Sequence, residues 1–274
     1  MILPNNMFCL GHVRNLEPGP NRLRVQGVHF TLFRDRDRID YDRSELPGQG
    51  LVLLEQHDLL WIYREDAGLP ELPEIPTLED HPPSQTISYD YAAPFKLVME
   101  NLYDLNHVGG THRKTSLARE IEVRNFESHG LWSEYDLVSK ASEAPEGLVS
   151  WLLLRLYIFF VGDKSREIHQ RIKLLFPGLL IFDESAGENK FKSFSLLTIY
   201  PIDDTHTRIV ACTSLRINPL LQTILNLLSL GRNYEIFAED KAVLENLTSD
   251  YTRKIKLEAD TPVDYARALY AEYA

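Results

Sequence analysis

Hydrophobic and polar positions alternate along two long stretches of the chain. The first covers residues 1–64, where apolar runs such as "RLRVQGVHFTLF" and "GLVLLEQHDLLWIYR" are separated by turns. The second covers residues 119–215 and contains longer runs between Gly, Asp, Asn and Pro: "REIEVRNFES", "SREIHQRIKLLF", "FKSFSLLTIYPI" and "THTRIVACTSLRI". A period of two residues is typical of half-buried strands. The pattern therefore predicts a small β unit followed by a sizeable antiparallel sheet.

A helical period replaces this alternation in two places. "TISYDYAAPFKLVMENLYDLNHV" begins as a strand and becomes helical near Pro94, which predicts one helix over residues 95–107 that ends at Gly109–Gly110. The C-terminal part is also predicted to be mostly helical. Its apolar stripe is expected to consist of Ile236, Phe237, Val243, Leu244 and Leu247. The fold class expected is α+β, with a large antiparallel sheet packed against a long C-terminal helix.

Prolines divide the chain into three parts. Five of them lie between Asp66 and Ser84 and interrupt every helix or central strand that this segment might form: Pro70, Pro73, Pro76, Pro82 and Pro83. An extended connector is the simplest interpretation. We therefore expect a β unit at 1–65, a connector at 66–84 and a main domain at 85–274.

Composition narrows the classes of partner. A chain of 274 residues with 44% hydrophobic residues is long enough to bury a full core, and its formal net charge of −11 argues against nucleic acid as a partner. The apolar runs 151–160 and 218–231 are too short to span a membrane; the first is expected to be a strand pair or buried segment and the second an amphipathic helix. With two cysteines, Cys9 and Cys212, and no leader segment, the expected location is the reducing cytoplasm.

Chemistry-bearing residues are concentrated in "MENLYDLNHVGGTH", residues 99–112. On a helix, Asn101, Asp104 and His107 would share one face, with His112 just beyond it. Two neutral histidines and a carboxylate with vacant positions are the ligand set of non-haem ferrous iron. Asp104 is better placed to accept a hydrogen bond from the second ring nitrogen of His107 than to be that carboxylate. The His-x4-His spacing alone is weak evidence, and the His-Glu-x-x-His pattern of zinc hydrolases is absent.

The same stretch resembles the Asn-x-x-Asp-x-x-His-x4-His signature of the catalytic domain of Rieske non-haem iron oxygenases, in the O-/N-demethylase and pheophorbide a oxygenase-like branch. "FAEDKAVLENL" (237–247) is similar to the segment that supplies the third iron ligand in that family; Asp240 is the matching position, and Glu239 is the second candidate. The resemblance implies a helix-grip-like catalytic domain. It also implies that His107, His112 and Asp240 bind the iron.

The N-terminal part resembles the Rieske domain of this family without its cluster-binding loops. "FCLGHVRNLEPGPNRLRVQGVHFTLFRDRDRI" and "PGQGLVLLEQHDLLWIYREDAGLP" are similar to its opening and closing strands, and only "DYDRSEL" (40–46) lies where a Cys-x-His and a Cys-x-x-His would hold a [2Fe–2S] cluster. Cys9 and His12 fit Cys-x-x-His by spacing, but no Cys-x-His occurs to complete the set. The expectation is a mononuclear Fe(II) site and no [2Fe–2S] cluster of the chain's own.

The resemblance also implies a reaction and partners. Ferrous iron would activate O2 to demethylate an O- or N-methyl group, or to monohydroxylate a small, largely apolar or aromatic substrate. Asp104 would connect a neighbouring cluster to His107, and Asn101 would support the metal site. Electrons would come from an external Rieske- or ferredoxin-type protein or a cluster-bearing paralogue, within a homo- or heterotrimer. Runs 151–160 and 218–231 can line the pocket or equally belong to the core.

Two other classes of protein are compatible with the sequence. A sheet with a long helix also serves simple ligand binding, so loss of the cluster can mark loss of turnover. A structural subunit that stabilises an oxygenase ring is the third possibility. Bound iron separates the enzyme from both alternatives.

Overall fold

The computed structural model describes most of the chain, with gaps in several loops. The described residues are 7–35, 38–41, 50–65, 85–112, 118–141, 148, 151–152, 154–155, 167–186, 191–216, 233–247 and 260–273. The predicted connector, most of "DYDRSEL", the run 218–231 and residues 156–160 lie outside them.

The N-terminal part consists of two small antiparallel sheets. The first has the order β1-β6-β5 and the second the order β2-β3-β4. Their strands are β1 (Phe8–His12), β2 (Gly19–Val25), β3 (Val28–Asp35), β4 (Arg38–Tyr41), β5 (Leu51–Gln56) and β6 (Leu59–Arg64), with a short 3-10 helix at Val13–Asn15. The strands predicted from the alternating pattern are therefore confirmed.

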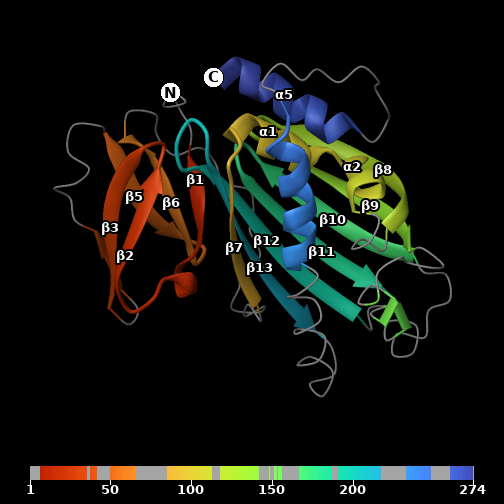
Figure 1. The fold of residues 1–274 in the computed structure, drawn as a ribbon, viewed down its shortest axis with the longest axis horizontal. Coiled ribbons are helices and arrows are strands. Elements are labelled where there is room, and N and C mark those ends of the chain that lie inside the picture. The colour runs from red at the N-terminus through yellow and green to blue at the C-terminus, as the bar shows by residue number, and fades with distance from the viewer. Residues whose placement is uncertain are drawn as a thin grey trace.

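A seven-stranded antiparallel sheet forms the main part of the molecule (Figure 1). Its order is β7-β13-β12-β11-β10-β9-β8, so six strands follow one another in the chain and β7 closes the edge beside β13. The strands are β7 (Gln85–Tyr91), β8 (Ala118–His129), β9 (Trp132–Ala141), β10 (Glu167–Leu175), β11 (Leu179–Ala186), β12 (Phe191–Pro201) and β13 (Thr207–Arg216). Sequence alternation predicts this sheet correctly.

Helices cover one face and one end of this sheet. Residues 233–244 form a helix, named here the crossing helix, that runs across the face of the sheet in Figure 1. Helix α1 (Phe95–Tyr103) and helix α5 (Thr261–Tyr273) pack together at one end of it. The α+β prediction is confirmed. In the predicted apolar stripe, Phe237 and Leu244 are buried, but Val243 is 38% exposed.

The predicted single helix over 95–107 is wrong in its second half. Helix α1 ends at Tyr103, and Asp104 adopts an extended conformation (φ −82°, ψ 93°). The Asp104 carboxylate accepts a hydrogen bond from the Asn106 backbone N–H at 3.0 Å, and this local bond competes with helix continuation. A second short helix, α2 (His107–Thr111), follows and continues through the glycine pair that was expected to end the first.

One hydrophobic core joins the N-terminal strands to the main sheet. All five residues of β1 are buried, and the strand packs against β12 and β13. A Cβ atom added to Gly11 would lie 3.4 Å from Val210 of β13, and the Asn15 side-chain amide donates to the Cys212 sulfur at 3.0 Å. The two parts are therefore packed as one body.

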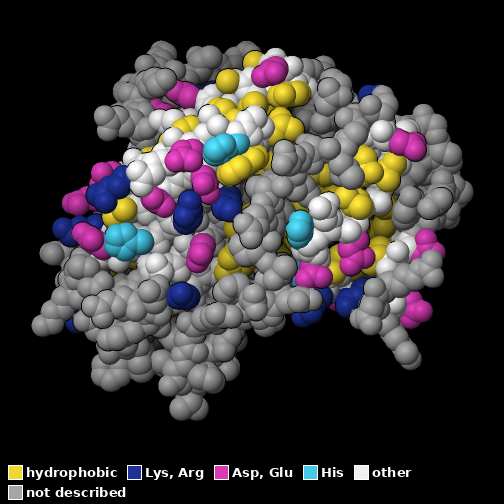
Figure 2. Space-filling model, turned by 180° about the vertical axis from the view of Figure 1, so that it is seen from behind, with side chains coloured by type: hydrophobic (Ala, Val, Ile, Leu, Met, Phe, Trp, Pro, Cys, Tyr) yellow, Lys and Arg dark blue, Asp and Glu magenta, His cyan; other side chains and the backbone are white. Residues whose placement is uncertain are grey.

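The outer surface mixes charges of both signs. Arg124, Asp136, Arg171 and Asp183 are cross-strand neighbours and form a row of alternating charge over four strands. Figure 2, which shows the molecule from behind, has acidic and basic side chains interspersed on this side. None of the described helices combines the length and apolar content needed to cross a bilayer.

The run 151–160 differs from its prediction where it is described. Residues 151, 152, 154 and 155 are helical, whereas a strand pair or buried segment was expected. Trp151 and Leu152 are exposed and Leu154 is buried, so only part of this run contributes to the core.

Candidate metal centre

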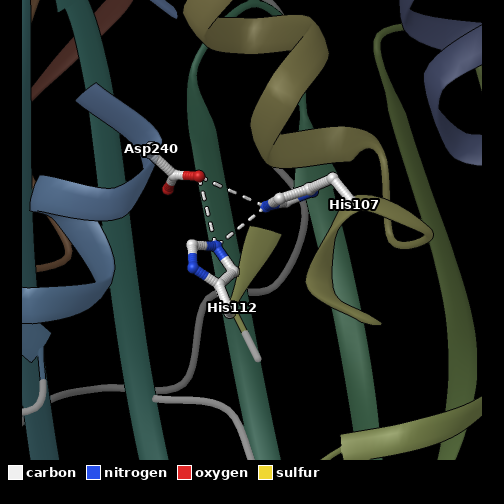
Figure 3. A group of neighbouring side chains, drawn as sticks. All are labelled: His107, His112 and Asp240. Atoms are coloured by element: carbon white, nitrogen blue, oxygen red, sulfur yellow. Dashed lines mark hydrogen bonds and ion pairs between the residues drawn. The ribbon is translucent and has the colours of Figure 1, made fainter. Parts of the chain in front are cut away.

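Three side chains from two distant segments point toward one another in front of the main sheet (Figure 3). His107 is the first residue of α2 and His112 directly follows it. Asp240 lies on the crossing helix. Helix α1 ends at Tyr103, and the chain then turns into α2. His107 at the start of α2 and His112 directly after its end both face the crossing helix.

The donor atoms of this group are closely spaced. The Nε2 atoms of His107 and His112 are 3.1 Å apart. Oδ1 of Asp240 lies 3.1 Å from Nε2 of His112 and 3.5 Å from Nε2 of His107. The side chain of His107 is 14% exposed, that of His112 is 4% exposed and that of Asp240 is 2% exposed.

These distances fit the coordination of one metal ion. Metal–ligand bonds of about 2.0–2.2 Å that meet near right angles hold neighbouring donor atoms about 3 Å apart. The Asp240 Oδ1 atom is buried and accepts no hydrogen bond of ordinary geometry from the described residues. A buried carboxylate oxygen without a donor is costly, and a cation between it and the two imidazole nitrogens removes that cost.

Burial lowers the pKa values of the two histidines, and the neighbouring carboxylates raise them. Burial lowers the pKa of His107, and the charge of Asp240 only partly offsets it. Burial also acts to lower the pKa of His112, but its interactions with Asp240 and Glu239 outweigh this effect and leave the pKa raised. His107 is therefore held neutral, which is the form that binds metals.

Asp104 and Asn101 lie beside this group rather than in it. His107 Nδ1 contacts the backbone carbonyl oxygen of Asp104, whereas the sequence predicted a hydrogen bond to the Asp104 carboxylate. Asn101 lies on α1, and its Nδ2 atom is buried with no partner among the described residues. No hydrogen bond or ion pair between described residues joins Asn101 to the three donors.

Asp260 and Glu239 support the segment that carries the histidines, and sequence reasoning missed Asp260. The Asn106 side-chain amide donates to the carboxylate of Asp260, a buried residue directly before α5, at 2.6 Å. Glu239 was a candidate metal ligand, but its Oε2 atom lies 3.0 Å from His112 Nδ1, on the other edge of the ring from Asp240. Nothing in the sequence predicted the contact between Asn106 and Asp260, because the two residues are far apart in the chain.

Two histidines and one carboxylate that converge on one point form the ligand set of non-haem Fe(II) oxygenases. Residues 91–272 match the family model described as "Vanillate O-demethylase oxygenase C-terminal domain". The chain belongs to this family, and it is a Rieske-type oxygenase alpha subunit, an enzyme of the non-haem iron class.

Solved structures agree with the fold. Dicamba monooxygenase bound to 3,6-dichlorosalicylic acid superposes with a TM-score of 0.74 at 13% identity, over 99% of this chain and 97% of that one. Pseudomonas putida CBB5 NdmA with caffeine gives 0.62 at 13% identity, over 97% and 89%. NdmB of the same strain gives 0.63 at 13% identity, with the same coverage. No curated protein matches the sequence significantly.

Proposed function

We propose that His107, His112 and Asp240 bind one ferrous iron and that the protein uses O2 to demethylate an O- or N-methyl group, or to monohydroxylate a small substrate. The observation that carries this proposal is a group of three donor atoms 3.1–3.5 Å apart, two of them on buried side chains and one on a partly buried side chain, from segments distant in the sequence. Two neutral imidazoles and one carboxylate leave coordination positions vacant. Ferrous iron bound there would supply the activation of O2.

The chain's own residues hold these donors in place. The carboxylate of Asp240 offsets part of the charge of the cation, and its 2% exposure keeps water from competing for it. The backbone carbonyl of Asp104 receives the Nδ1–H of His107, which leaves Nε2 free to bind metal. The bond between Asn106 and Asp260 ties the metal-site segment to α5.

Stoichiometry requires an electron source. Demethylation of an O-methyl group consumes O2, two protons and two electrons and releases an alcohol, formaldehyde and water. A Rieske [2Fe–2S] cluster needs two cysteines and two histidines, and the sequence offers Cys9 with His12 but no Cys-x-His to complete the set. We infer that the chain holds no [2Fe–2S] cluster of its own and takes electrons from an external Rieske- or ferredoxin-type protein, or a cluster-bearing paralogue, that docks beside Asp104 in a trimeric assembly.

We expect the substrate to bind against the face of the main sheet that lies under the crossing helix. This face is largely apolar and carries two polar pairs. A ring contact between Tyr89 and the crossing helix identifies the side of the sheet that faces the metal group. Cross-strand register and alternation assign two hydrogen-bonded pairs to the same side. Gln170 donates to Glu184 at 2.7 Å, and Ser195 donates to Thr213 at 3.2 Å. We expect a largely apolar or aromatic substrate that carries one hydrogen-bonding group.

Iron content tests the proposal directly. Anaerobically purified protein should bind about one iron per chain with little visible colour, and His107→Ala or His112→Ala should abolish binding. His169→Ala is the matched control, because that histidine lies in β10 and its side chain is 56% exposed. Turnover should require both a reductase and a separate cluster protein.

Three results would contradict the proposal. A metal-free wild-type protein would favour a ligand-binding or structural role. The red-brown absorption of a [2Fe–2S] centre would contradict the assignment of the electron source to another protein. Substrate turnover with NADH and a reductase, in the absence of any cluster protein, would do the same.

A further inference from the structure

Two neighbouring acidic residues contact opposite edges of one imidazole ring. Glu239 and Asp240 are consecutive on the crossing helix. Oε2 of Glu239 lies 3.0 Å from Nδ1 of His112, and Oδ1 of Asp240 lies 3.1 Å from Nε2 of the same ring. The ring is 4% exposed, and the side chains of Asp240 and Glu239 are 2% and 24% exposed.

This arrangement separates the two candidates for the third metal ligand. The two nitrogen lone pairs of an imidazole point in divergent directions, so one ion cannot bind both. Asp240 shares its position with the Nε2 atoms of both histidines, whereas Glu239 contacts the edge of His112 that faces away from that point. Glu239 is therefore placed to act on the ligand rather than on the metal.

A neutral imidazole carries one N–H and one lone pair, and an ionised carboxylate can only accept a hydrogen bond. With Glu239 at Nδ1, the proton is held at Nδ1 and the lone pair of Nε2 is left for the metal. In the other tautomer, an Nε2–H group would point at Asp240 and block coordination.

We propose that Glu239 is a positioning residue that fixes the tautomer and orientation of His112. This inference rests on the proposed iron site. At His107 the same task falls to a backbone carbonyl, that of Asp104, so Glu239 is the side chain through which the task can be tested.

Cobalt(II) binding to the metal-free protein, followed by its visible absorption under anaerobic conditions, tests the role of Glu239 without any need for turnover. Glu239→Ala should weaken binding about 10- to 100-fold. Glu239→Gln should weaken it less, because the amide oxygen still accepts from Nδ1–H although the charge is lost. Glu235→Ala, one turn earlier on the same helix and exposed, should bind like the wild type.

A second measurement reads the tautomer itself. In ¹⁵N NMR of the metal-free protein, recorded at a pH high enough for the His112 ring to be neutral, His112 should carry its proton on Nδ1 in the wild type and in Glu239→Gln, and should shift toward the Nε2–H form in Glu239→Ala. Equal cobalt affinity of the wild type and Glu239→Ala would overturn the inference and leave the iron site intact. A wild-type protein that binds no cobalt would overturn the iron site as well.

Discussion

Divalent metal binding should stabilise the fold, and Asp240→Asn should remove most of this effect. The donors come from α2 and the crossing helix, which are far apart in the sequence, so the unfolded chain cannot hold them 3.1–3.5 Å apart. A ligand that binds only the folded state stabilises it by mass action. An ion bound by these donors would also join the segment after α1 to the crossing helix.

The expected size follows from this linkage. At a free metal concentration 100 times the dissociation constant, binding contributes about 2.7 kcal/mol. For a protein of this size that corresponds to a rise in Tm of about 5–10 °C, at about 2–4 °C per kcal/mol. If loss of the Asp240 charge weakens binding about 100-fold, the same metal concentration contributes about 0.4 kcal/mol, or about 1 °C.

Differential scanning calorimetry under anaerobic conditions measures the shift, with ferrous iron or cobalt as the metal and magnesium as the control ion. Each variant is compared with its own metal-free form, so that any effect of the substitution on the metal-free fold cancels. A shift in Asp240→Asn as large as that of the wild type would refute the reasoning, because the carboxylate would then not be a ligand.

Two further substitutions test the fold around the site. A Cβ atom at Gly178 would lie 2.1 Å from the backbone oxygen of Ile199, so Gly178→Ala should lower the free energy of unfolding in urea by about 2–3 kcal/mol. Gly130 lies in open space at φ +67°, so Gly130→Ala should lower it by only about 1 kcal/mol. Equal losses in the two variants would contradict this account. The Thr205 backbone N–H lowers the pKa of Asp203 below its usual value, so its stabilisation is complete above the unfolded-state pKa and is lost as the pH falls. Asp203→Asn should therefore lower stability by roughly 1 kcal/mol at pH 7, with a deficit that shrinks between about pH 5 and pH 2 in chemical unfolding; a deficit independent of pH would show that the charge is not responsible.

The sheet was predictable because several of its strands carry their own signal. The segments that form β8, β10, β12 and β13 alternate apolar and polar residues and are bounded by turn residues, so the period of two needs no tertiary information. The end of α1 gave no such signal. It depends on the Asp104 carboxylate, which bonds to the Asn106 backbone instead of leaving that N–H to a helix, and the sequence allows either outcome.

The candidate site was likewise predictable only in part. The spacing of His107 and His112 marks a candidate pair, but the choice between Glu239 and Asp240 depends on the rotation of the crossing helix. Consecutive helical residues point about 100° apart. Only the packing of Phe237 and Leu244 against the core fixes which of the two carboxylates reaches both histidines.

The burial of β1 has a consequence for how this protein can be shortened. The strand covers β12 and β13, and the turn between β2 and β3 is also bonded to the main sheet at the end of β12: the backbone N–H groups of Gln26 and Gly27 donate to the carbonyl oxygens of Pro201 and Ile202 at 2.8 and 2.7 Å. Removing the first strands would expose to water the face of β12 and β13 that β1 covers, and the carbonyl oxygens of Pro201 and Ile202 would lose these donors. The N-terminal β unit is therefore part of the packing of the main sheet, and this structural role does not depend on a redox group.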